Sequence, residues 1–351
     1  MEMVSDMTLP SETPAIWARN LSKTYSFIEK EAGLAGSFRS LFRGRRVSVE
    51  AVKSIDLEIR AGEVIGLIGP NGAGKTTTLK MLAGILYPTA GELRVLGFLP
   101  YRREKAFLQN LSFVTGQRNR LFWDLPAEEY FEFCRVIYEI PRETYQKNLR
   151  RLIELAEIGE ILKTPQRKLS AGQRKRCEIV AALLHDPKVI FLDEPTNALD
   201  LVNARKIREF IREKGKEGHH AILLTSHNMS DIEQVCQKVI ILNRGTIAFQ
   251  GPLEDLYRVQ RARRQIRVSF REPVPPLPLE EMGRVLRRNG REAWLEVEPE
   301  KAATVASRLF AQFPVRDISI LDPPLEEMIE AIYRGPAVPD RAMDPPHPGP
   351  R

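Results

Sequence analysis

The 351-residue chain has 43% hydrophobic and 28% charged residues and a mean hydropathy of −0.28, a composition typical of a folded protein with an apolar core. This composition excludes an intrinsically disordered chain, a collagen and a disulfide-rich miniprotein. The longest apolar runs have the length of strands, far below the ~20 residues that a membrane-spanning helix needs. Acidic residues near the amino-terminus leave no apolar signal segment, so we expect a cytoplasmic protein.

The net charge of +7 is compatible with binding to nucleic acid, with contact to an anionic membrane surface, or with an arginine-rich proteome. The three cysteines are far apart, which predicts reduced, packed thiols rather than a disulfide or a metal site. The length predicts two domains, or one large domain with an appendage.

In chain order, residues 1–14 are short and polar, and we expect a disordered lead. Strands are expected from Ile16 to Tyr25, over 49–59 and over 63–68, with an insertion at 26–48 between the first two. A glycine loop and a helix to about Leu86 follow. Between about residues 117 and 185, apolar side chains recur at helical spacing, which predicts a helical subdomain. After this segment, predicted strands alternate with predicted helices. This pattern predicts an α/β domain over 15–257 with a largely parallel sheet.

The composition changes after residue 257. Residues 258–291 hold ten arginines, no lysine and only three carboxylates. Strand and helix patterns continue to about residue 335 and predict a small accessory α+β domain over 258–335. The stretch 336–351 contains six prolines and is expected to be a disordered tail.

The motif with the clearest chemistry is GPNGAGKTT at 69–77, placed between a predicted strand and a predicted helix. Glycines let backbone N–H groups surround phosphates, and the helix amino-terminus favours a bound anion. The lysine reaches the β- and γ-phosphates, and the hydroxyl that follows binds Mg²⁺. The motif predicts a site for a nucleoside triphosphate, formed by Asn71, Gly72, Ala73, Gly74, Lys75, Thr76 and Thr77.

A second motif, VIFLDE at 189–194, is an apolar strand that ends in two carboxylates. In phosphoryl transfer a carboxylate holds the metal ion and another orients the attacking water. We therefore expect Asp193 to bind Mg²⁺, with Thr76, and Glu194 to polarise the water that attacks the nucleotide.

Between these motifs lies LSAGQ at 169–173, which resembles the LSGGQ signature of the ATP-binding cassette (ABC) family, with Ala171 in place of a glycine. The resemblance implies the P-loop NTPase fold of an ABC nucleotide-binding domain, a RecA-like core with a helical subdomain. It also implies that two subunits clamp ATP between them, as a homodimer or with another ABC ATPase. Ser170, Gly172 and Gln173 would then contact the nucleotide of the opposite subunit, and Ser170 could also cap its own helix.

Other family positions follow in order. Gln117 lies where the family has the glutamine that senses Mg²⁺ and the attacking water, Asp200 lies in the segment that communicates across the dimer, and His227 matches the switch histidine at the γ-phosphate. Tyr25 is the expected adenine-stacking aromatic, although it precedes Gly69 by 69 − 25 = 44 residues, more than is usual. The other histidines have no such context, and we expect them to be structural or exposed: His185, His219, His220 and His347.

Residues 117–126 and 320–327 resemble the ATP-binding subunits of ABC-2 type exporters, the branch of drug and sodium exporters with an amino-terminal insertion. The resemblance implies ATP hydrolysis that drives a separate membrane permease from the cytoplasmic face of the cell membrane, without stable nucleic-acid binding. The basic, amphipathic stretch 37–46 could contact the membrane surface or the permease, or pack on its own domain. The alternative is a non-transport ABC ATPase acting on nucleic acid or ribosomes, which the single P-loop and the absence of heptad runs disfavour.

Overall fold

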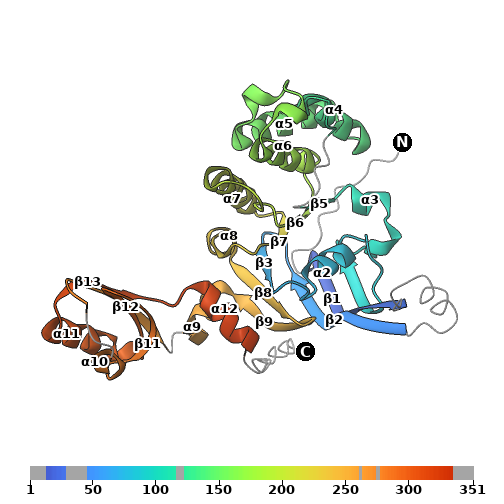
Figure 1. Ribbon diagram of the computed structural model, residues 1–351. Coiled ribbons are helices and arrows are strands. Elements are labelled where there is room, and N and C mark those ends of the chain that lie inside the picture. Colours follow the sequence, from blue (N-terminus) through green and yellow to red (C-terminus); the bar gives the residue numbers. More distant parts are fainter. Residues whose placement is uncertain (1–12, 29–45, 116–121, 261–262, 274–276, 335–351) are drawn as a thin grey trace, which may run out of the picture. The chain divides into compact units, whose positions relative to one another are not determined.

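The computed structural model describes residues 13–28, 46–115, 122–260, 263–273 and 277–334 (Figure 1). Outside these residues lie positions 1–12 of the expected disordered lead, the whole expected tail 336–351, positions 37–45 of the amphipathic stretch, and Gln117. The chain divides into two compact units, Met1–Gln250 and Gly251–Arg351. The domain boundary that we expected after residue 257 lies inside a helix of the second unit, α9 (Leu253–Gln260).

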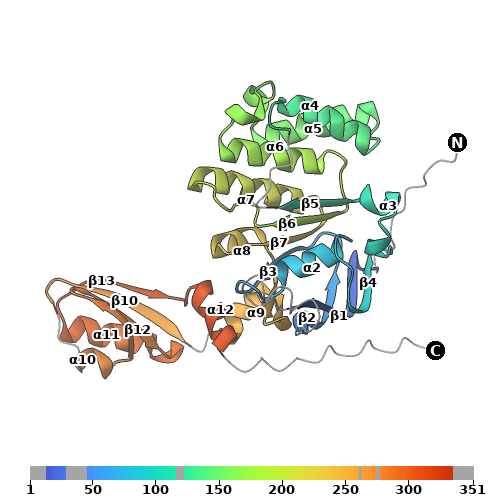
Figure 2. The ribbon, with the colours of Figure 1, turned by 45° about the vertical axis from the view of Figure 1, so that its right-hand side comes forward.

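A six-stranded sheet forms the centre of the first unit, in the order β5-β6-β7-β3-β8-β9. The pairs from β5 to β8 are parallel, which confirms the predicted α/β class. β3 and β7 are buried along their whole length because helices cover both faces of such a sheet (Figure 2). The strands are β3 (Val64–Ile68), β5 (Leu111–Thr115), β6 (Val189–Asp193), β7 (Ala221–Thr225), β8 (Lys238–Asn243) and β9 (Thr246–Pro252).

A second, antiparallel sheet has the order β2-β1-β4, with β1 (Ile16–Ile28), β2 (Arg46–Ile59) and β4 (Ala90–Val95). The sequence analysis missed β4. It also placed the insertion at 26–48, whereas Ser26 pairs with Ser48 and Ile28 with Arg46, so both ends of that segment continue the strand ladder. Helix α2 (Lys75–Leu82) packs with both sheets around one hydrophobic core.

Helix α2 ends at Leu82, so its predicted extension to Leu86 is wrong. The physical reason is Gly84, which has a φ of 68° and turns the backbone out of the helix. The helical subdomain is confirmed as three helices beside the β5 edge (Figure 1), α4 (Ala127–Ile137), α5 (Arg142–Ala156) and α6 (Ala171–Leu183). The remaining helices of this unit are α3 (Lys105–Leu108), α7 (Leu201–Lys216), α8 (Met229–Val235), η1 (Pro100–Arg102), η2 (Gly159–Ile161) and η3 (Gln166–Lys168).

The second unit has an antiparallel sheet of order β11-β12-β10-β13 with its own apolar core, an α+β arrangement as expected. Alternate residues of β10 and β12 face this core, which is the pattern of a sheet covered on one face. Its elements are α9, β10 (Arg264–Phe270), α10 (Leu277–Glu280), β11 (Arg284–Asn289), β12 (Glu292–Val297), η4 (Pro299–Lys301), α11 (Ala302–Gln312), β13 (Val315–Leu321) and α12 (Leu325–Arg334).

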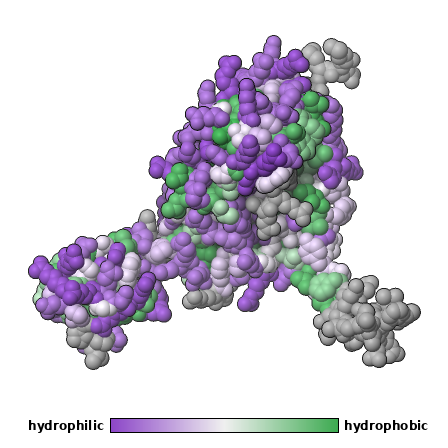
Figure 3. All heavy atoms as spheres, turned by 45° about the horizontal axis from the view of Figure 1, so that its top comes forward, coloured by the Kyte–Doolittle hydropathy of each residue, from purple (hydrophilic) through white to green (hydrophobic). Residues whose placement is uncertain are grey.

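Within the residues that the structure describes, every helix is too short or too polar to cross a lipid bilayer. The face drawn in Figure 3 is largely hydrophilic, with apolar residues in local patches.

Candidate functional site

The glycine loop between β3 and α2 has a backbone that only glycine can adopt at several positions. Gly72 and Gly74 have φ angles of 80° and 107°, in the left-handed region. A Cβ on Gly74 would lie 2.5 Å from the carbonyl oxygen of Ala51, and one on Gly69 would lie 2.6 Å from that of Leu242. The loop therefore packs closely against the backbone of Ala51 and Leu242. It leads directly into α2, and the amino-terminus of a helix is a favourable place for a bound phosphate.

Lys75 lies inside this loop and is almost fully buried. Its Nζ donates hydrogen bonds to the carbonyl oxygens of Gly69, at 2.6 Å, and Pro70, at 3.1 Å. Burial lowers the pKa of the ammonium, while the carboxylates of Glu194 and Asp193 act in the opposite direction. A buried ammonium that donates hydrogen bonds only to neutral carbonyls is stabilised strongly when an anionic phosphate replaces them as the acceptor.

Asp193 ends β6 beside the first residues of α2. Its two carboxylate oxygens each lie 3.4 Å from the Thr76 hydroxyl oxygen, and one of them accepts a hydrogen bond of 2.8 Å from Thr225. Oxygen ligands from a carboxylate and a hydroxyl are those that Mg²⁺ prefers. The structure therefore brings the two predicted metal ligands, Thr76 and Asp193, together, while the third, Gln117, lies outside the described residues.

Glu194 and His227 meet at the carboxyl ends of adjacent strands β6 and β7. The Nε2 atom of His227 lies 2.9 Å from a carboxylate oxygen of Glu194, and the Nδ2 of Asn197 donates to the other oxygen at 3.0 Å. The backbone of Glu194 has a φ of 54°, and its N–H donates to both oxygens of Thr225. The carboxylate is three-quarters buried and fixed from both sides, as a group that orients water must be.

Asp231 on α8 is a buried hub behind this pair. It is 2% exposed and accepts hydrogen bonds from the hydroxyls of Thr196 and Ser226 and from the guanidinium of Arg208 at 3.0 Å. Thr196 follows Glu194 by two residues, and Ser226 directly precedes His227. The hub therefore ties both catalytic segments to helices α7 and α8.

The signature segment begins α6 with Ser170 as the N-cap, as predicted, and the structure adds a capping box. The Ser170 hydroxyl accepts from the backbone N–H of Gln173, and the Gln173 side chain accepts from the N–H of Ser170. Gly172 faces helix α7, because a Cβ there would lie 2.3 Å from the side chain of Asn203. Asn203 is itself held by Asp200, the N-cap of α7.

The remaining predicted nucleotide contacts lie on the surface or within the glycine loop. Asn71 and Thr76 are exposed and Ala73 is buried, while Thr77 is intermediate. Tyr25 lies on β1 opposite Val49; the residue is 39% exposed, with the Nζ of Lys23 5.5 Å from the ring centre. This exposure leaves room for a stacking base.

Sequence reasoning missed three residues that the structure places at the site: Thr225, Asn197 and Asp231. Thr225 could have been found, because residues that end neighbouring parallel strands lie side by side, and Thr225 is in register with Asp193. Asn197 and Asp231 carried no such signal.

Two family models match this chain. One described as "ABC transporter" matches residues 52–197, and one described as "EvrA-like ABC transporter, C-terminal domain" matches residues 262–321. The chain is 32% identical over 221 residues to ABC transporter ATP-binding protein NatA of Bacillus subtilis, an alignment that covers 63% of this chain and 89% of that protein. It is also 32% identical over 256 residues to an uncharacterised ABC transporter ATP-binding protein, YxlF, of the same organism, covering 73% of this chain and 78% of the relative.

Among solved structures, cbiO1 from Clostridium perfringens, part of the ABC transporter complex cbiONQ, aligns with a TM-score of 0.58 and 25% identity. The alignment covers 70% of this chain and 92% of cbiO1. The fold described above therefore also occurs in a protein of known structure.

Proposed function

Because this chain belongs to the family of ABC transporter ATP-binding proteins, we propose that it hydrolyses ATP as the nucleotide-binding subunit of an ABC-2 type exporter. The observation that carries this proposal is the Glu194–His227 pair, fixed beside Asp193, Thr76 and the P-loop. The export subtype is supported by the resemblance of residues 117–126 and 320–327 to that branch.

Binding starts at the glycine loop. The phosphates of ATP lie against the backbone N–H groups of residues 69–77 and the amino-terminus of α2. Lys75 exchanges its two carbonyl partners for phosphate oxygens, which are charged acceptors and hence stronger ones. As the γ-phosphoryl group leaves, the same ammonium faces the developing negative charge.

Mg²⁺ fits the donors that the site offers, since the Thr76 hydroxyl and the Asp193 carboxylate are hard oxygen ligands already close together. When bound, the ion neutralises charge on the β- and γ-phosphates. Thr225 donates to Asp193 and keeps this carboxylate turned toward Thr76.

Glu194 accepts the proton of the water that attacks the γ-phosphate. Without nucleotide its carboxylate is held by Asn197 on one oxygen and by His227 on the other, and the bond from Asn197 continues to orient it when the water arrives. His227 is 47% exposed and can turn from Glu194 to the γ-phosphate once nucleotide is present.

A second subunit is needed to complete the site. Gly172 of the signature segment packs against the start of α7, where Leu201 is 84% and Val202 is 65% exposed. Two neighbouring apolar side chains at such exposure are typical of a surface that a partner covers. We therefore infer a dimer around two ATP molecules, either of two copies of this chain or of this chain and another ABC ATPase, with Ser170, Gly172, Gln173 and Asp200 at its interface.

The permease is expected to bind an apolar patch on the helical subdomain, called here the docking patch: Phe122, Trp123, Leu125, Phe133, Val136 and Ile137, each between 38% and 58% exposed. Phe122 and Phe133 already pack edge to face at 5.4 Å between ring centres, which gives the patch a defined shape. A rigid aromatic surface of this kind is suited to anchor a helix from a membrane protein.

The docking patch is linked to the signature segment through Arg167 and Arg174, which flank that segment in the chain. The guanidinium carbon of Arg174 on α6 lies 5.4 Å from the Trp123 ring centre, and Arg174 also donates to the carbonyl oxygen of Leu169. The backbone N–H of Arg167 donates to the carbonyl oxygen of Trp123 at 3.0 Å. Movement of the patch would therefore shift the segment that closes on the opposite nucleotide, which supports coupling of the permease to the dimer.

These partners imply a location at the cytoplasmic face of the membrane, with the second unit as an accessory domain. The substrate path would lie in the permease.

The first test is nucleotide-dependent dimerisation, measured by analytical ultracentrifugation with and without ATP and Mg²⁺. Glu194→Gln keeps the hydrogen-bond acceptor but loses the base, so it should accumulate an ATP-bound dimer. Lys75→Ala should bind no ATP and remain monomeric. A Glu194→Gln protein that stays monomeric at saturating ATP would contradict the shared site.

The second test identifies the partner, by pull-down of tagged Glu194→Gln protein from native membranes with ATP, followed by mass spectrometry. An ABC-2 type permease should be recovered, and Ile137→Glu in the docking patch should abolish its recovery. Ile85→Glu is the matched control, because Ile85 is similarly exposed, 52% against 58% for Ile137, and lies outside the patch. Recovery of ribosomes or DNA-associated proteins without a permease would instead favour the non-transport alternative.

A further inference from the structure

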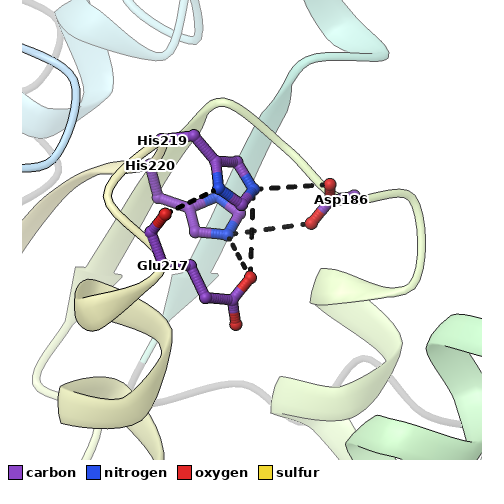
Figure 4. Close-up of side chains that lie close together, drawn as sticks. All are labelled: Asp186, Glu217, His219 and His220. Carbon is purple, nitrogen blue, oxygen red and sulfur yellow. Dashed lines mark hydrogen bonds and ion pairs between the residues drawn. The ribbon is translucent and has the colours of Figure 1, made fainter.

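A cluster of four titratable side chains lies at the edge of the main sheet opposite the nucleotide site (Figure 4). Asp186 precedes β6, and Glu217, His219 and His220 precede β7. Because β6 and β7 are parallel, their amino ends meet at one edge, while Glu194 and His227 lie at the other. The cluster therefore has no part in the chemistry described above.

The hydrogen bonds of the two histidines fix which ring nitrogen carries the proton. The Nδ1 of His220 lies 2.8 Å from the carbonyl oxygen of Pro187, and the Nδ1 of His219 lies 3.2 Å from the carbonyl oxygen of Glu217. A carbonyl only accepts, so each Nδ1 is the donor. In the neutral rings both Nε2 atoms then carry lone pairs.

These lone pairs face acceptors. The Nε2 of His220 lies 3.3 Å from Glu217 and 3.7 Å from Asp186, and that of His219 lies 3.5 Å from Asp186 and 3.9 Å from Glu217. A neutral nitrogen lone pair opposite a carboxylate oxygen is repulsive unless a positive charge lies between them. His220 is fully buried, so bulk water does not separate its ring from these carboxylates.

We propose that the four side chains of Figure 4 form a binding site for one divalent transition-metal ion, with zinc as the best match. Imidazole nitrogen and carboxylate oxygen are ordinary zinc ligands, with bonds of about 2.0–2.2 Å. A tetrahedron of such bonds has edges of roughly 3.3–3.6 Å. The two Nε2 atoms lie 3.3 and 3.9 Å from the same Glu217 oxygen, and each is near a different oxygen of Asp186, at 3.7 and 3.5 Å. One ligand atom from each of the four residues lies within 4.8 Å of the others.

The Nδ1–carbonyl bonds are also the support that metal-binding histidines have elsewhere, because they fix the tautomer and the ring orientation. Both rings come from adjacent residues, and their centres lie 3.9 Å apart. Little rearrangement of the two rings would therefore be required to bind the ion.

Two cations face the cluster, and one of them competes with the metal. Arg151 pairs with the other oxygen of Glu217 at 3.0 Å and can remain. The Nζ of Lys214, which is nearly buried, lies 3.0 Å from the oxygen of Glu217 that faces His220 and 3.6 Å from Asp186. The ion must displace this ammonium from the shared oxygen, so Lys214 sets the affinity of the site.

A bound ion would tie the loop before β6 to the turn before β7. These strands carry Asp193, Glu194 and Thr225 at their other ends, so the metal would stabilise the scaffold of the ATPase site without touching nucleotide.

The test is titration of the full, chelator-stripped chain with Zn²⁺, by competition with a chromophoric chelator and without nucleotide. We expect one saturable ion per chain. His219→Asn should weaken binding at least about tenfold, because asparagine can keep the donor to the Glu217 carbonyl but has no Nε2. His219 is half exposed, so this variant should fold.

The matched control is His227→Asn, the same substitution at a histidine of similar exposure that also lies near a carboxylate. It should leave zinc affinity unchanged, and Lys214→Gln should raise it. X-ray absorption should show nitrogen and oxygen ligands only. The proposal is overturned if the parent shows no saturable binding, or if His227→Asn rather than His219→Asn removes it. An unchanged affinity in Lys214→Gln would contradict the competition by Lys214.

Discussion

Replacement of Asp231 by alanine tests the buried hub behind the catalytic pair. The carboxylate is 2% exposed and accepts bonds from two hydroxyls and from Arg208, whose side chain is 10% exposed. Asp231→Ala therefore leaves the Arg208 guanidinium buried without its counter-charge, and leaves the hydroxyls of Thr196 and Ser226 without this acceptor.

The size of the effect follows from these contacts. Loss of one partner of a buried ion pair costs about 3–5 kcal/mol, and each buried hydroxyl without a partner can add ~1 kcal/mol or more. A natural domain has roughly 5–15 kcal/mol of stability in total. We therefore expect Asp231→Ala to lose at least about 3 kcal/mol, close to the limit at which the domain still folds.

The assay is urea unfolding of the full chain, read from the transition of the first unit. Arg208→Met with Asp231→Leu removes both charges and should recover part of the loss. The control is Arg205→Ala on the same helix, which breaks an exposed pair with Glu209 and should cost under ~1 kcal/mol. If Asp231→Ala costs no more than this control, or if the double substitution is no better than Asp231→Ala, the reasoning fails.

The hub also predicts a catalytic effect that a merely structural role would not produce. Asp231→Asn keeps the volume of the side chain and weakens its bonds to the segments that carry Glu194 and His227. It should lower kcat for ATP hydrolysis more than it raises KM, because nucleotide binding rests on the glycine loop. Equal changes in both parameters would argue against positioning.

Three further predictions concern other parts of the first unit. Gly172→Ala should cost about 1–3 kcal/mol by crowding the Asn203 side chain, and addition of Asn203→Ala should restore part of it in thermal unfolding. Burial lowers the pKa of His185 to about 4, below ~6.5 in the unfolded chain, so the unfolded state binds more protons between these values. Stability should fall as the pH drops from about 6.5 to about 4, and His185→Gln should flatten this dependence in urea unfolding. Burial also raises the pKa of the Cys134 and Cys177 thiols to about 11 and raises that of Cys236, so a thiol reagent at neutral pH should label the cysteines only after denaturant is added; rapid labelling of the native protein would refute this.

The motifs that bind nucleotide could be predicted from the sequence because each is local. The spacing of glycines, lysine and threonine in residues 69–77 determines how the loop turns and where α2 begins, and Ser170 and Gln173 need only three residues of separation to form their capping box. Short apolar runs that alternate with segments of helical periodicity were enough to predict a parallel sheet, because parallel strands are buried on both faces.

The sequence was less informative where short elements depend on distant partners. Strand β4 is exposed along most of its length and has no clear alternation, so only its pairing with β1 defines it. The end of α2 depended on the close packing of Gly84 against the backbone of Pro100.

By itself, the sequence determined the class of chemistry: a P-loop, a strand ending in Asp193 and Glu194, and a signature segment, in an order that belongs to one family. Only the tertiary structure decided which side chains from different segments meet. The pairing of His227 with Glu194, the three bonds to Asp231, the contact of Gly172 with Asn203 and the cluster of Figure 4 all join residues from separate elements. The physical reason is that strand order and helix packing place these groups within hydrogen-bond distance, and neither is encoded in local spacing along the chain.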